Sequence, residues 1–319
     1  MTVPGCPALL IEAFAEGPCT GNGAAVVLLD RPLGPGWMQA VAGSLRQSET
    51  AFLLQQDGRW LLRWFTPGCE VPLCGHATLA AVLGLGVWGL LPPGAELSFA
   101  TRSGCLPVAL ARHRTLSARV TLPGGALLPA AIPEPVHQLL LLRGVARIQC
   151  YWRSPLGYQV ALLPADAPLA TMEGIAGDLV GETRRGLVLM QSVGDRPGSG
   201  VGPAVLGEPA DYQLRFFAPG LGIEEDPVTG SAHALVAGYW MEHLGRPHVV
   251  GWQCSDRPGG MVCDAASSGM IRLSGRGHLL WDGTLLMEPP CGVDEADDGP
   301  GWQSLLPDAS SSAAATTPS

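Results

Sequence analysis

The chain has 319 residues, of which 47% are hydrophobic and 15% are charged, with 43 Gly and 29 Pro. This length and composition suit a globular protein of one large or two medium domains, with many tight turns between short helices and strands. The net charge of −9 argues against a nucleic-acid partner, and all 19 basic residues are Arg. A chain without lysine forms no Schiff base and has no P-loop lysine, so those two kinds of chemistry are excluded.

Nine cysteines are scattered along the chain without the paired spacing of a zinc site. Their odd number, and the polar start MTVPGCPA without a signal peptide, predict free thiols in a reducing cytoplasm. The apolar run from His76 to Leu91 is too short to cross a bilayer and contains internal glycines. We therefore expect a buried helix there, with no membrane contact and no metal site.

In chain order, the first half alternates short apolar runs with turn residues and helical patterns. It predicts two adjacent strands, a helix, two strands around an Asp-Gly turn, a long helix and further short strands (8–14, 24–30, 37–47, 50–65, from His76, and 97–123). The second half repeats the order of strands, long helix and strands (158–164, 185–191, 212–219, from Ser231, and two last strands within 269–287). We expect a mixed α/β (α+β) fold, with an exposed loop at 197–209.

The predicted boundaries place an N-terminal lobe at 1–125 and a C-terminal lobe at 126–277. A last strand at about 278–288 can return to the first lobe. Residues 289–319 are acidic and then rich in Ser and Ala, without a periodic apolar face. We expect this segment to be a disordered tail.

One sequence pattern occurs twice. Residues 63–80 read RWFTPGCEVPLCGHATLA and residues 215–235 read RFFAPGLGIEEDPVTGSAHAL, and both end in a small-residue turn that opens an apolar helix pattern. The two copies predict two similar lobes that present matching helix starts to one site. Because the N–H groups at a helix start attract anions, two such starts would hold a small carboxylate.

Glu49 is a candidate base, because it lies in QSETAFLL directly before an apolar strand. Partial desolvation there would raise its pKa into the range of a group that takes and returns a proton. A solvated acid at a strand edge, or an acid at a helix C-terminus, is the structural alternative. His76 and Ser231 hold equivalent positions at the two helix starts, where each can contact an anion and where the helix lowers the pKa of an imidazole. The alternatives are a core or capping histidine and an N-cap serine.

Asp226 lies in EEDPVTGSAH, and the following proline fixes its direction, so it is a candidate to orient His76 across the site. A solvated acidic loop is the alternative.

Cys74 corresponds to Thr229 in the second copy. A thiol beside a helix start can act as an acid, base or nucleophile, whereas a small buried hydrophobic residue is the structural interpretation.

These motifs resemble those of the PhzF-like isomerase family of phenazine biosynthesis. The resemblance extends over about residues 8–287 and is carried by GNGAAVVLL, SETAFL, the two repeated segments and QCSDRPGG, above all by SET, CGHAT and EDPVTGSA. It implies the diaminopimelate-epimerase-like fold, in which two similar lobes each wrap a mixed, barrel-like sheet around a central helix. It also implies cofactor-independent isomerisation at a site between the lobes, and a homodimer.

The resemblance implies a role for each motif residue. Glu49 would move a proton between two carbons of a small carboxylic acid, while His76 and Asp226 would position the substrate and share its proton. Substrate contacts would come from Asn22, Cys74 and the N–H groups around Gly75, Gly230 and Ser231. This chain departs from the family where Gly23 replaces a proline and relaxes the loop, and where Cys74 faces Thr229 instead of a second cysteine.

Three functional hypotheses remain open at this point. The first is an isomerase with Glu49 as its single acid/base, acting on a carboxylate-bearing metabolite. The second is a single-thiol epimerase or racemase that uses Cys74. The third is a protein that keeps the fold for small-molecule binding or protein interaction without catalysis. Proton exchange on a bound metabolite distinguishes the third hypothesis from the other two.

Overall fold

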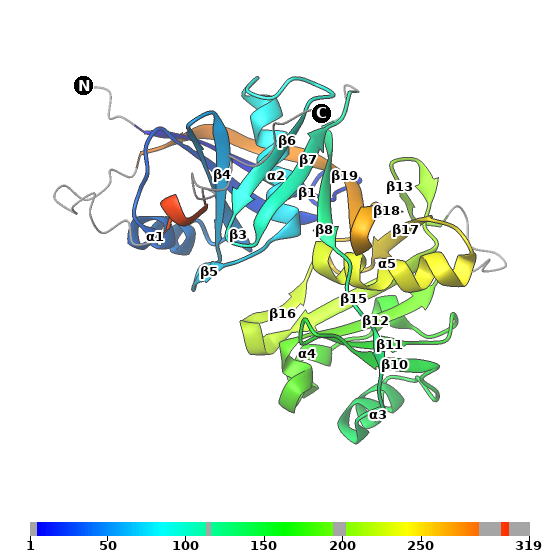
Figure 1. Ribbon diagram of the computed structural model, residues 1–319. Helices are drawn as coiled ribbons and strands as arrows, with labels where there is room; N and C mark the ends of the chain where they lie inside the picture. Colours follow the sequence, from blue (N-terminus) through cyan, green and yellow to red (C-terminus); the bar gives the residue numbers. More distant parts are fainter. Residues whose placement is uncertain (1–4, 113–115, 194–201, 287–300, 306–319) are drawn as a thin grey trace, which may run out of the picture.

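The computed structural model describes residues 5–112, 116–193, 202–286 and 301–305, and Figure 1 shows them as two lobes. The sheet of the first lobe closes into a barrel of eight strands, as the family resemblance implied. Its strands are β1 (Cys6–Ala13), β2 (Asn22–Leu29), β3 (Glu49–Gln56), β4 (Arg59–Phe65), β6 (Glu96–Thr101), β7 (Gly104–Leu110), β8 (Ser117–Pro123) and β19 (Met270–Leu285). Parallel pairs (β2 with β3, β4 with β6) alternate with antiparallel ones, which makes the sheet mixed.

Helix α2 (Gly75–Val87) fills the barrel of the first lobe, and Figure 1 shows it surrounded by strands. Every residue from Gly75 to Leu85 is buried, so the helix has no polar face in this stretch. Its small residues allow close packing, since a Cβ on Gly84 would lie 3.3 Å from Val26 and 3.4 Å from Leu9. The apolar run that begins at His76 is therefore the buried helix that the sequence predicts.

The second lobe repeats this arrangement around helix α5 (Gly230–Leu244). Its strands are β9 (Leu128–Pro129), β10 (Cys150–Arg153), β11 (Gln159–Leu162), β12 (Leu187–Ser192), β15 (Tyr212–Ala218), β17 (His248–Gln253) and β18 (Gly259–Ala265). The pairing directions follow the order of the first lobe, with parallel pairs β11/β12 and β15/β17 separated by the antiparallel pair β12/β15. The predicted fold class, with two similar lobes around central helices, is confirmed.

Strand β19 connects the two lobes. Its first part pairs with β8 and β18, and from Gly277 onward it pairs with β1. The prediction of two strands within 269–287 is wrong here, because one strand runs continuously through the GRG sequence. Gly275 and Gly277 do not form a turn; they allow close packing. A Cβ would lie 2.4 Å from Phe14 at Gly275 and 2.4 Å from Leu83 at Gly277.

The remaining elements cover the outside of the lobes or join their strands. They are α1 (Pro35–Leu45), β5 (Glu70–Val71), α3 (Glu134–Leu141), η1 (Leu169–Thr171), α4 (Ile175–Asp178), η2 (Gly181–Arg185), β13 (Ala204–Val205), β14 (Glu208–Pro209), η3 (Pro219–Leu221), β16 (Ile223–Asp226), η4 (Ser267–Gly269) and η6 (Gln303–Leu305). The predicted exposed loop at 197–209 is corrected, because β13 and β14 form a hairpin and Val205 is buried against Val250 and Val262. Residues 197–201 of that prediction lie outside the described residues.

The prediction of a disordered tail at 289–319 is wrong for Gly301–Leu305. Trp302 is 0% exposed, and its indole N–H donates to the backbone oxygen of Leu33 at 3.0 Å. Trp302 and Leu305 join a core cluster with residues of α1, and Figure 1 shows this segment in red beside α1. One large aromatic side chain anchors the segment, a feature that an acidic, periodicity-free composition conceals. Residues 289–300 and 306–319 lie outside the described residues.

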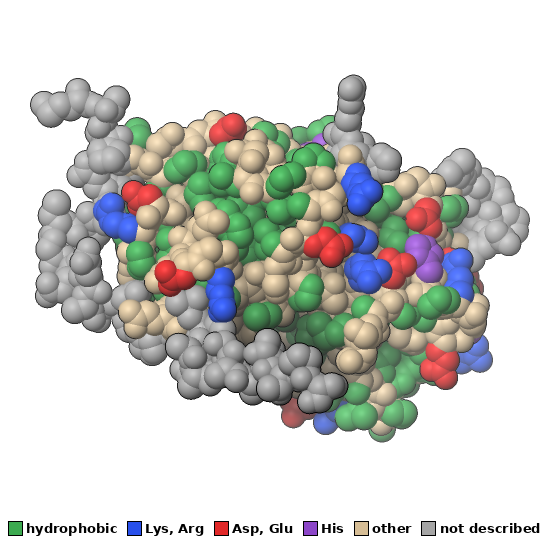
Figure 2. All heavy atoms as spheres, turned by 45° about the horizontal axis from the view of Figure 1, so that its top comes forward, with side chains coloured by type: hydrophobic (Ala, Val, Ile, Leu, Met, Phe, Trp, Pro, Cys, Tyr) green, Lys and Arg blue, Asp and Glu red, His purple; other side chains and the backbone are tan. Residues whose placement is uncertain are grey.

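The described surface mixes apolar and charged areas. Figure 2 shows a face with a broad apolar area in its middle, beside which basic and acidic side chains are interspersed. Within the described ranges, no helix is long and apolar enough to cross a membrane. The cytoplasmic location and the absence of a nucleic-acid partner stay predictions.

Close packing between the lobes gives the first testable prediction. A Cβ added at Gly259 would lie 2.1 Å from the backbone oxygen of Phe14, and backbone cannot move aside cheaply. We expect Gly259→Ala to lower the free energy of unfolding by more than about 2 kcal/mol. Gly238→Ala is the control, because this exposed position in α5 has no atom within 4 Å of the added Cβ. Urea denaturation should show that variant to be as stable as the wild type or more stable by about 0.5–1 kcal/mol.

Candidate active site

The two central helices begin side by side. A Cβ added to Gly75 would lie 3.4 Å from the Cα of Gly230, and the reverse substitution gives the same distance. Cys74 and Thr229 are the residues before the two helices, both have extended backbones, and neither caps its helix through its side chain. The structure thus brings the two predicted helix starts together, with their N–H groups near one point.

Glu49 begins β3, and the parallel partner strand β2 begins at Asn22, so both side chains start at the same edge of the barrel. Glu49 is only 8% exposed, which excludes the solvated strand-edge interpretation. Its Oε2 lies 3.0 Å from Nε2 of His76. The carboxylate is therefore buried against an imidazole at the start of α2.

His76 lies between the carboxylate and a thiol. Its Nδ1 is 3.5 Å from the Sγ of Cys74, on the side of the ring away from Glu49. Burial raises the pKa of the Cys74 thiol to about 11, with the Glu49 charge acting in the same direction. The thiol is therefore protonated near neutral pH and contacts Nδ1, while Nε2 faces the carboxylate.

The pKa of His76 differs in direction from the sequence prediction. A helix start and burial both oppose a charged imidazole, yet Cys74 and Glu49 outweigh this opposition and raise the pKa of His76 well above its usual value. The prediction of a lowered imidazole pKa is therefore wrong, and a proton can reside on the His76–Glu49 pair.

Asp226 ends β16 and is buried beside the same group, but it does not bond to His76 directly. Its Oδ1 accepts from Nδ2 of Asn22 at 2.7 Å and its Oδ2 accepts from Thr229 at 2.5 Å. Asn22 lies between Asp226 and His76, with its Nδ2 3.3 Å from the imidazole Nδ1. The structure therefore connects Asp226 to His76 through Asn22, and the orienting role of Asp226 stays a prediction.

Asn22 links the lobes at this site. It stands on β2 of the first lobe, and its Nδ2 also donates to the backbone oxygen of Val228 in the second lobe at 3.1 Å. Its Oδ1 accepts from the hydroxyl of Ser48 at 3.0 Å. Gly23, which we expected in a relaxed loop, lies within β2 and pairs with Glu12. Asn22 is thus held by strand pairing and by three hydrogen bonds.

Three further residues at the site were missed as candidates. Ser48 holds Asn22, and Gln253 accepts from the Thr229 N–H at 2.8 Å and donates to the Asp226 backbone oxygen at 2.5 Å. The SET and QCSD motifs contain these two residues, so the sequence offered a signal for them. No sequence motif contains Tyr158, yet its hydroxyl lies 3.2 Å from that of Ser231. Ser231 is inside the first turn of α5 and is not an N-cap.

Asp226 gives a pH-dependent prediction. Burial, with a smaller contribution from Glu49, raises its pKa from 3.8 to about 6. A folded pKa above the unfolded one means that the stabilising contribution is complete below about pH 4 and is lost as the pH rises through about 6. We expect Asp226→Asn to increase stability by up to about 3 kcal/mol near pH 8 and by little near pH 4.

Thermal unfolding of both proteins across this pH range measures the effect. Thr229→Val is a control that removes a hydrogen bond to the carboxylate and keeps the carboxylate itself. It should lack the stability gain near pH 8. An Asp226→Asn protein less stable than the wild type near pH 8 would contradict the raised pKa.

A metal ion is a second use for these side chains, because Glu49, Cys74 and His76 each place a ligand atom within 4.8 Å of the others. The donor set of carboxylate, thiol and imidazole suits zinc. In this arrangement the thiol contacts Nδ1 and the carboxylate faces Nε2, so the two groups lie at different nitrogens of the ring. The arrangement fits a proton pathway better than a chelate.

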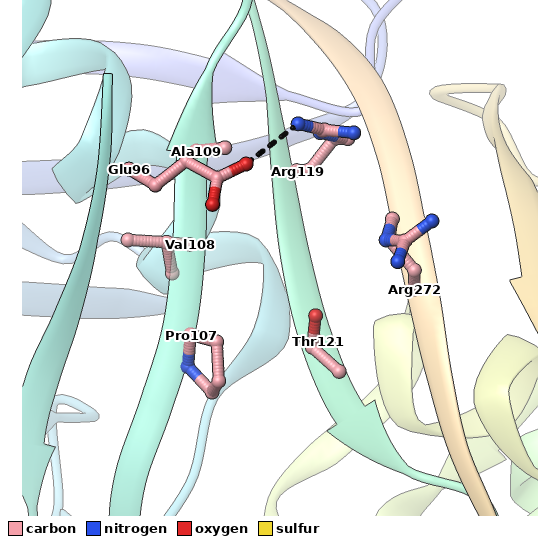
Figure 3. Close-up of a pocket in the computed structure, with 7 residues that line it drawn as sticks. All are labelled: Glu96, Pro107, Val108, Ala109, Arg119, Thr121 and Arg272. Carbon is pink, nitrogen blue, oxygen red and sulfur yellow. Dashed lines mark hydrogen bonds and ion pairs between the residues drawn. The ribbon is translucent and has the colours of Figure 1, made fainter. Parts of the chain in front are cut away.

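A separate pocket of about 150 Å³ lies on the outer surface of the first lobe (Figure 3). It is lined by Glu96, Pro107, Val108, Ala109, Arg119, Thr121 and Arg272. Figure 3 shows an ion pair between Arg119 and Glu96, with Arg272 farther along the wall. None of the candidate active-site residues lines this pocket, so it is distinct from the meeting point of the helices.

Comparison with known proteins places the chain in a family. Residues 11–124 and 191–280 match a family model described as phenazine biosynthesis-like protein. The chain is 36% identical over 275 residues to an uncharacterized isomerase of Pseudomonas aeruginosa, covering 86% of this chain and 96% of the relative. It is 32% identical over 297 residues to the human phenazine biosynthesis-like domain-containing protein, with 88% and 98% covered.

A solved structure agrees. The PhzF-family protein of Enterococcus faecalis superposes with a TM-score of 0.75 at 28% identity, covering 88% of this chain and 99% of that chain. The two repeated motifs that form the helix starts fall inside the ranges matched by the family model. The sequence resemblance noted from SET, CGHAT and EDPVTGSA is thereby confirmed. The chain belongs to the phenazine biosynthesis-like, or PhzF-like, family.

Proposed function

We propose that this protein is a cofactor-independent isomerase that moves a proton between two carbons of a small carboxylic acid. The observation that carries the proposal is the buried Glu49 carboxylate, 3.0 Å from His76, where the two helix starts meet. Membership of a family whose relatives include a named isomerase supports the reaction class. Substrate identity is open beyond a carboxylate-bearing metabolite.

In the proposed reaction, Glu49 takes a proton from a substrate carbon and leaves the C–H electron pair in a conjugated anion. Glu49 then returns that proton to another carbon of the same anion, so no oxidant, reductant or cofactor is consumed. While Glu49 carries the substrate proton, His76 keeps its own proton and holds the Glu49 side chain in the same orientation for the second step. A carboxylate held beside an imidazole can take a proton and return it within one site.

The substrate carboxylate would bind to the N–H groups around Gly75, Gly230 and Ser231. Two helix starts stabilise negative charge at one point, and this preorganised field would also stabilise the intermediate anion. Asn22 and Cys74 would line the substrate site, and Asp226, with its pKa near 6, would exchange a proton with bound substrate. These assignments follow from their positions around Glu49.

A second candidate function rests on the contact between Cys74 and His76. In that alternative the thiol, deprotonated by the imidazole, removes the substrate proton as a single-thiol epimerase or racemase. The raised pKa of Cys74, about 11, makes the thiolate costly to form, and the residue opposite is Thr229 instead of a second thiol. The Glu49 mechanism is therefore favoured.

A metabolite screen tests the proposed function. Carboxylic acids that raise the unfolding temperature would be incubated with the protein in D2O and examined by mass spectrometry for C–H exchange. An isomerase should incorporate deuterium into at least one stabilising ligand. Ligands that stabilise the protein without exchange would instead indicate a binding protein. The homodimer implied by the family stays a prediction, which analytical ultracentrifugation can test.

A further inference from the structure

Two arginine–glutamate pairs hold the segments that lead into the central helices. Arg63 contacts Glu70 through Nε at 2.8 Å and Nη2 at 2.9 Å, and Glu70 lies in β5, directly before α2. Arg215 contacts Glu225 in the same two-point way, at 2.7 and 2.6 Å, and Glu225 lies in β16, directly before α5. Each pair fixes one helix start relative to a barrel strand.

Both arginines are buried over an aromatic ring. The guanidinium carbon of Arg63 is 5.4 Å from the ring centre of Phe65, and that of Arg215 is 5.0 Å from the ring centre of Phe217. Arg63 is 3% exposed and Arg215 is 7% exposed. A buried charge of this kind depends on complete coverage, because its attraction to the carboxylate weakens when water reaches it.

The two pairs differ in what completes that coverage. In the second lobe, Nη1 of Arg215 donates to the backbone oxygens of Leu169 at 3.1 Å and Met172 at 2.5 Å. In the first lobe, Nη1 of Arg63 has no hydrogen-bond partner among the described residues. The ring of Trp302 packs against this guanidinium instead, with its centre 5.2 Å from the guanidinium carbon. Trp302, itself 0% exposed, is thus a second aromatic ring over Arg63 besides Phe65.

Trp302 comes from outside the matched part of the family, since the family model ends at residue 280. The Enterococcus faecalis structure is matched over 99% of its own length, and this match uses 88% of the present chain. We propose that Trp302 is a positioning residue, which shields the Arg63–Glu70 pair from water and so fixes the Cys74–His76 segment at the start of α2. The effect of Trp302 on catalysis rests on the proposed function, whereas its effect on the position of the Cys74–His76 segment does not.

The reactivity of Cys74 tests the proposal without a substrate. Its thiol is nearly buried, so alkylation by iodoacetamide requires the segment before α2 to open. Cys263, fully buried in the second lobe, serves as the internal reference in the same protein. Peptide mass spectrometry would follow both alkylation rates in the full chain carrying Trp302→Leu or Trp302→Phe. Both variants lose the indole N–H, but only leucine loses the aromatic face.

We expect Trp302→Leu to increase the alkylation rate of Cys74 by roughly three- to thirtyfold, the range of a desolvated cation–π contact. Trp302→Phe should stay within about twofold of the wild type, and Cys263 should be unchanged in both. Equal rates for the two variants would show that only packing matters and would overturn the proposal. A parallel increase at Cys263 would overturn it as well, because the effect would then be global unfolding.

Discussion

Glu49→Gln is expected to lower the rate of substrate C–H exchange by about 10²–10⁴-fold, the usual contribution of a positioned general acid/base. Glutamine keeps the size of the side chain and its hydrogen-bonding capacity but cannot accept a proton from carbon. Glu49 is buried 3.0 Å from His76, so glutamine also removes an interaction that raises the pKa of His76, and the variant should unfold at a lower temperature than the wild type while remaining folded. A loss of exchange in the folded variant is then assigned to the missing carboxylate.

Deuterium incorporation into a ligand found by the metabolite screen measures this effect, with circular dichroism and thermal unfolding to verify the fold. Cys74→Ala is the matched control, because it removes another group in contact with His76, the thiol beside Nδ1. Under the Glu49 mechanism the control retains most of the exchange. Exchange that survives Glu49→Gln but disappears in Cys74→Ala would reject the carboxylate mechanism and establish the thiol one.

The parts of the molecule that the sequence predicts well are those controlled by local patterns. The hairpin strands on either side of the Asp57–Gly58 turn, the helix after Cys74 and the helix after Thr229 depend on turn residues and on nearby apolar spacing. The burial of Glu49 followed from its apolar neighbours in β3. Internal comparison of the two motif copies was enough to expect Gly75 opposite Gly230.

Other features depend on contacts between distant segments and could not be read locally. The GRG sequence of β19 resembles a turn until Phe14 and Leu83 are seen to occupy the space that side chains would need. The pKa of His76 is raised by Cys74 and by Glu49, a partner on another strand, and together they outweigh the burial and the helix start that oppose a charged imidazole. Trp302 stands in an acidic, polar segment, and only the tertiary structure shows the arginine that it covers.

Asn22→Asp is expected to have the second largest effect, because it places a second carboxyl group where Asp226 now accepts a hydrogen bond. The two side chains are 2.7 Å apart, so both cannot be ionised at once. One proton would be retained by the pair, and the folded pKa of that pair would rise above the value near 6 of Asp226 in the wild type. A raised folded pKa means stability that is present at low pH and lost as the pH increases.

The variant should therefore be close to the wild type in stability near pH 5 and less stable by roughly 3–5 kcal/mol near pH 8, the usual range for an uncompensated buried charge. Urea denaturation at both pH values measures the difference, and the exchange assay should lose activity in parallel. Ser48→Ala is the control, since it removes only the hydroxyl that donates to Asn22 Oδ1. Its cost should be about 1 kcal/mol at either pH. Equal losses for Asn22→Asp at both pH values would mean that geometry, and not charge, makes this contact between the lobes essential.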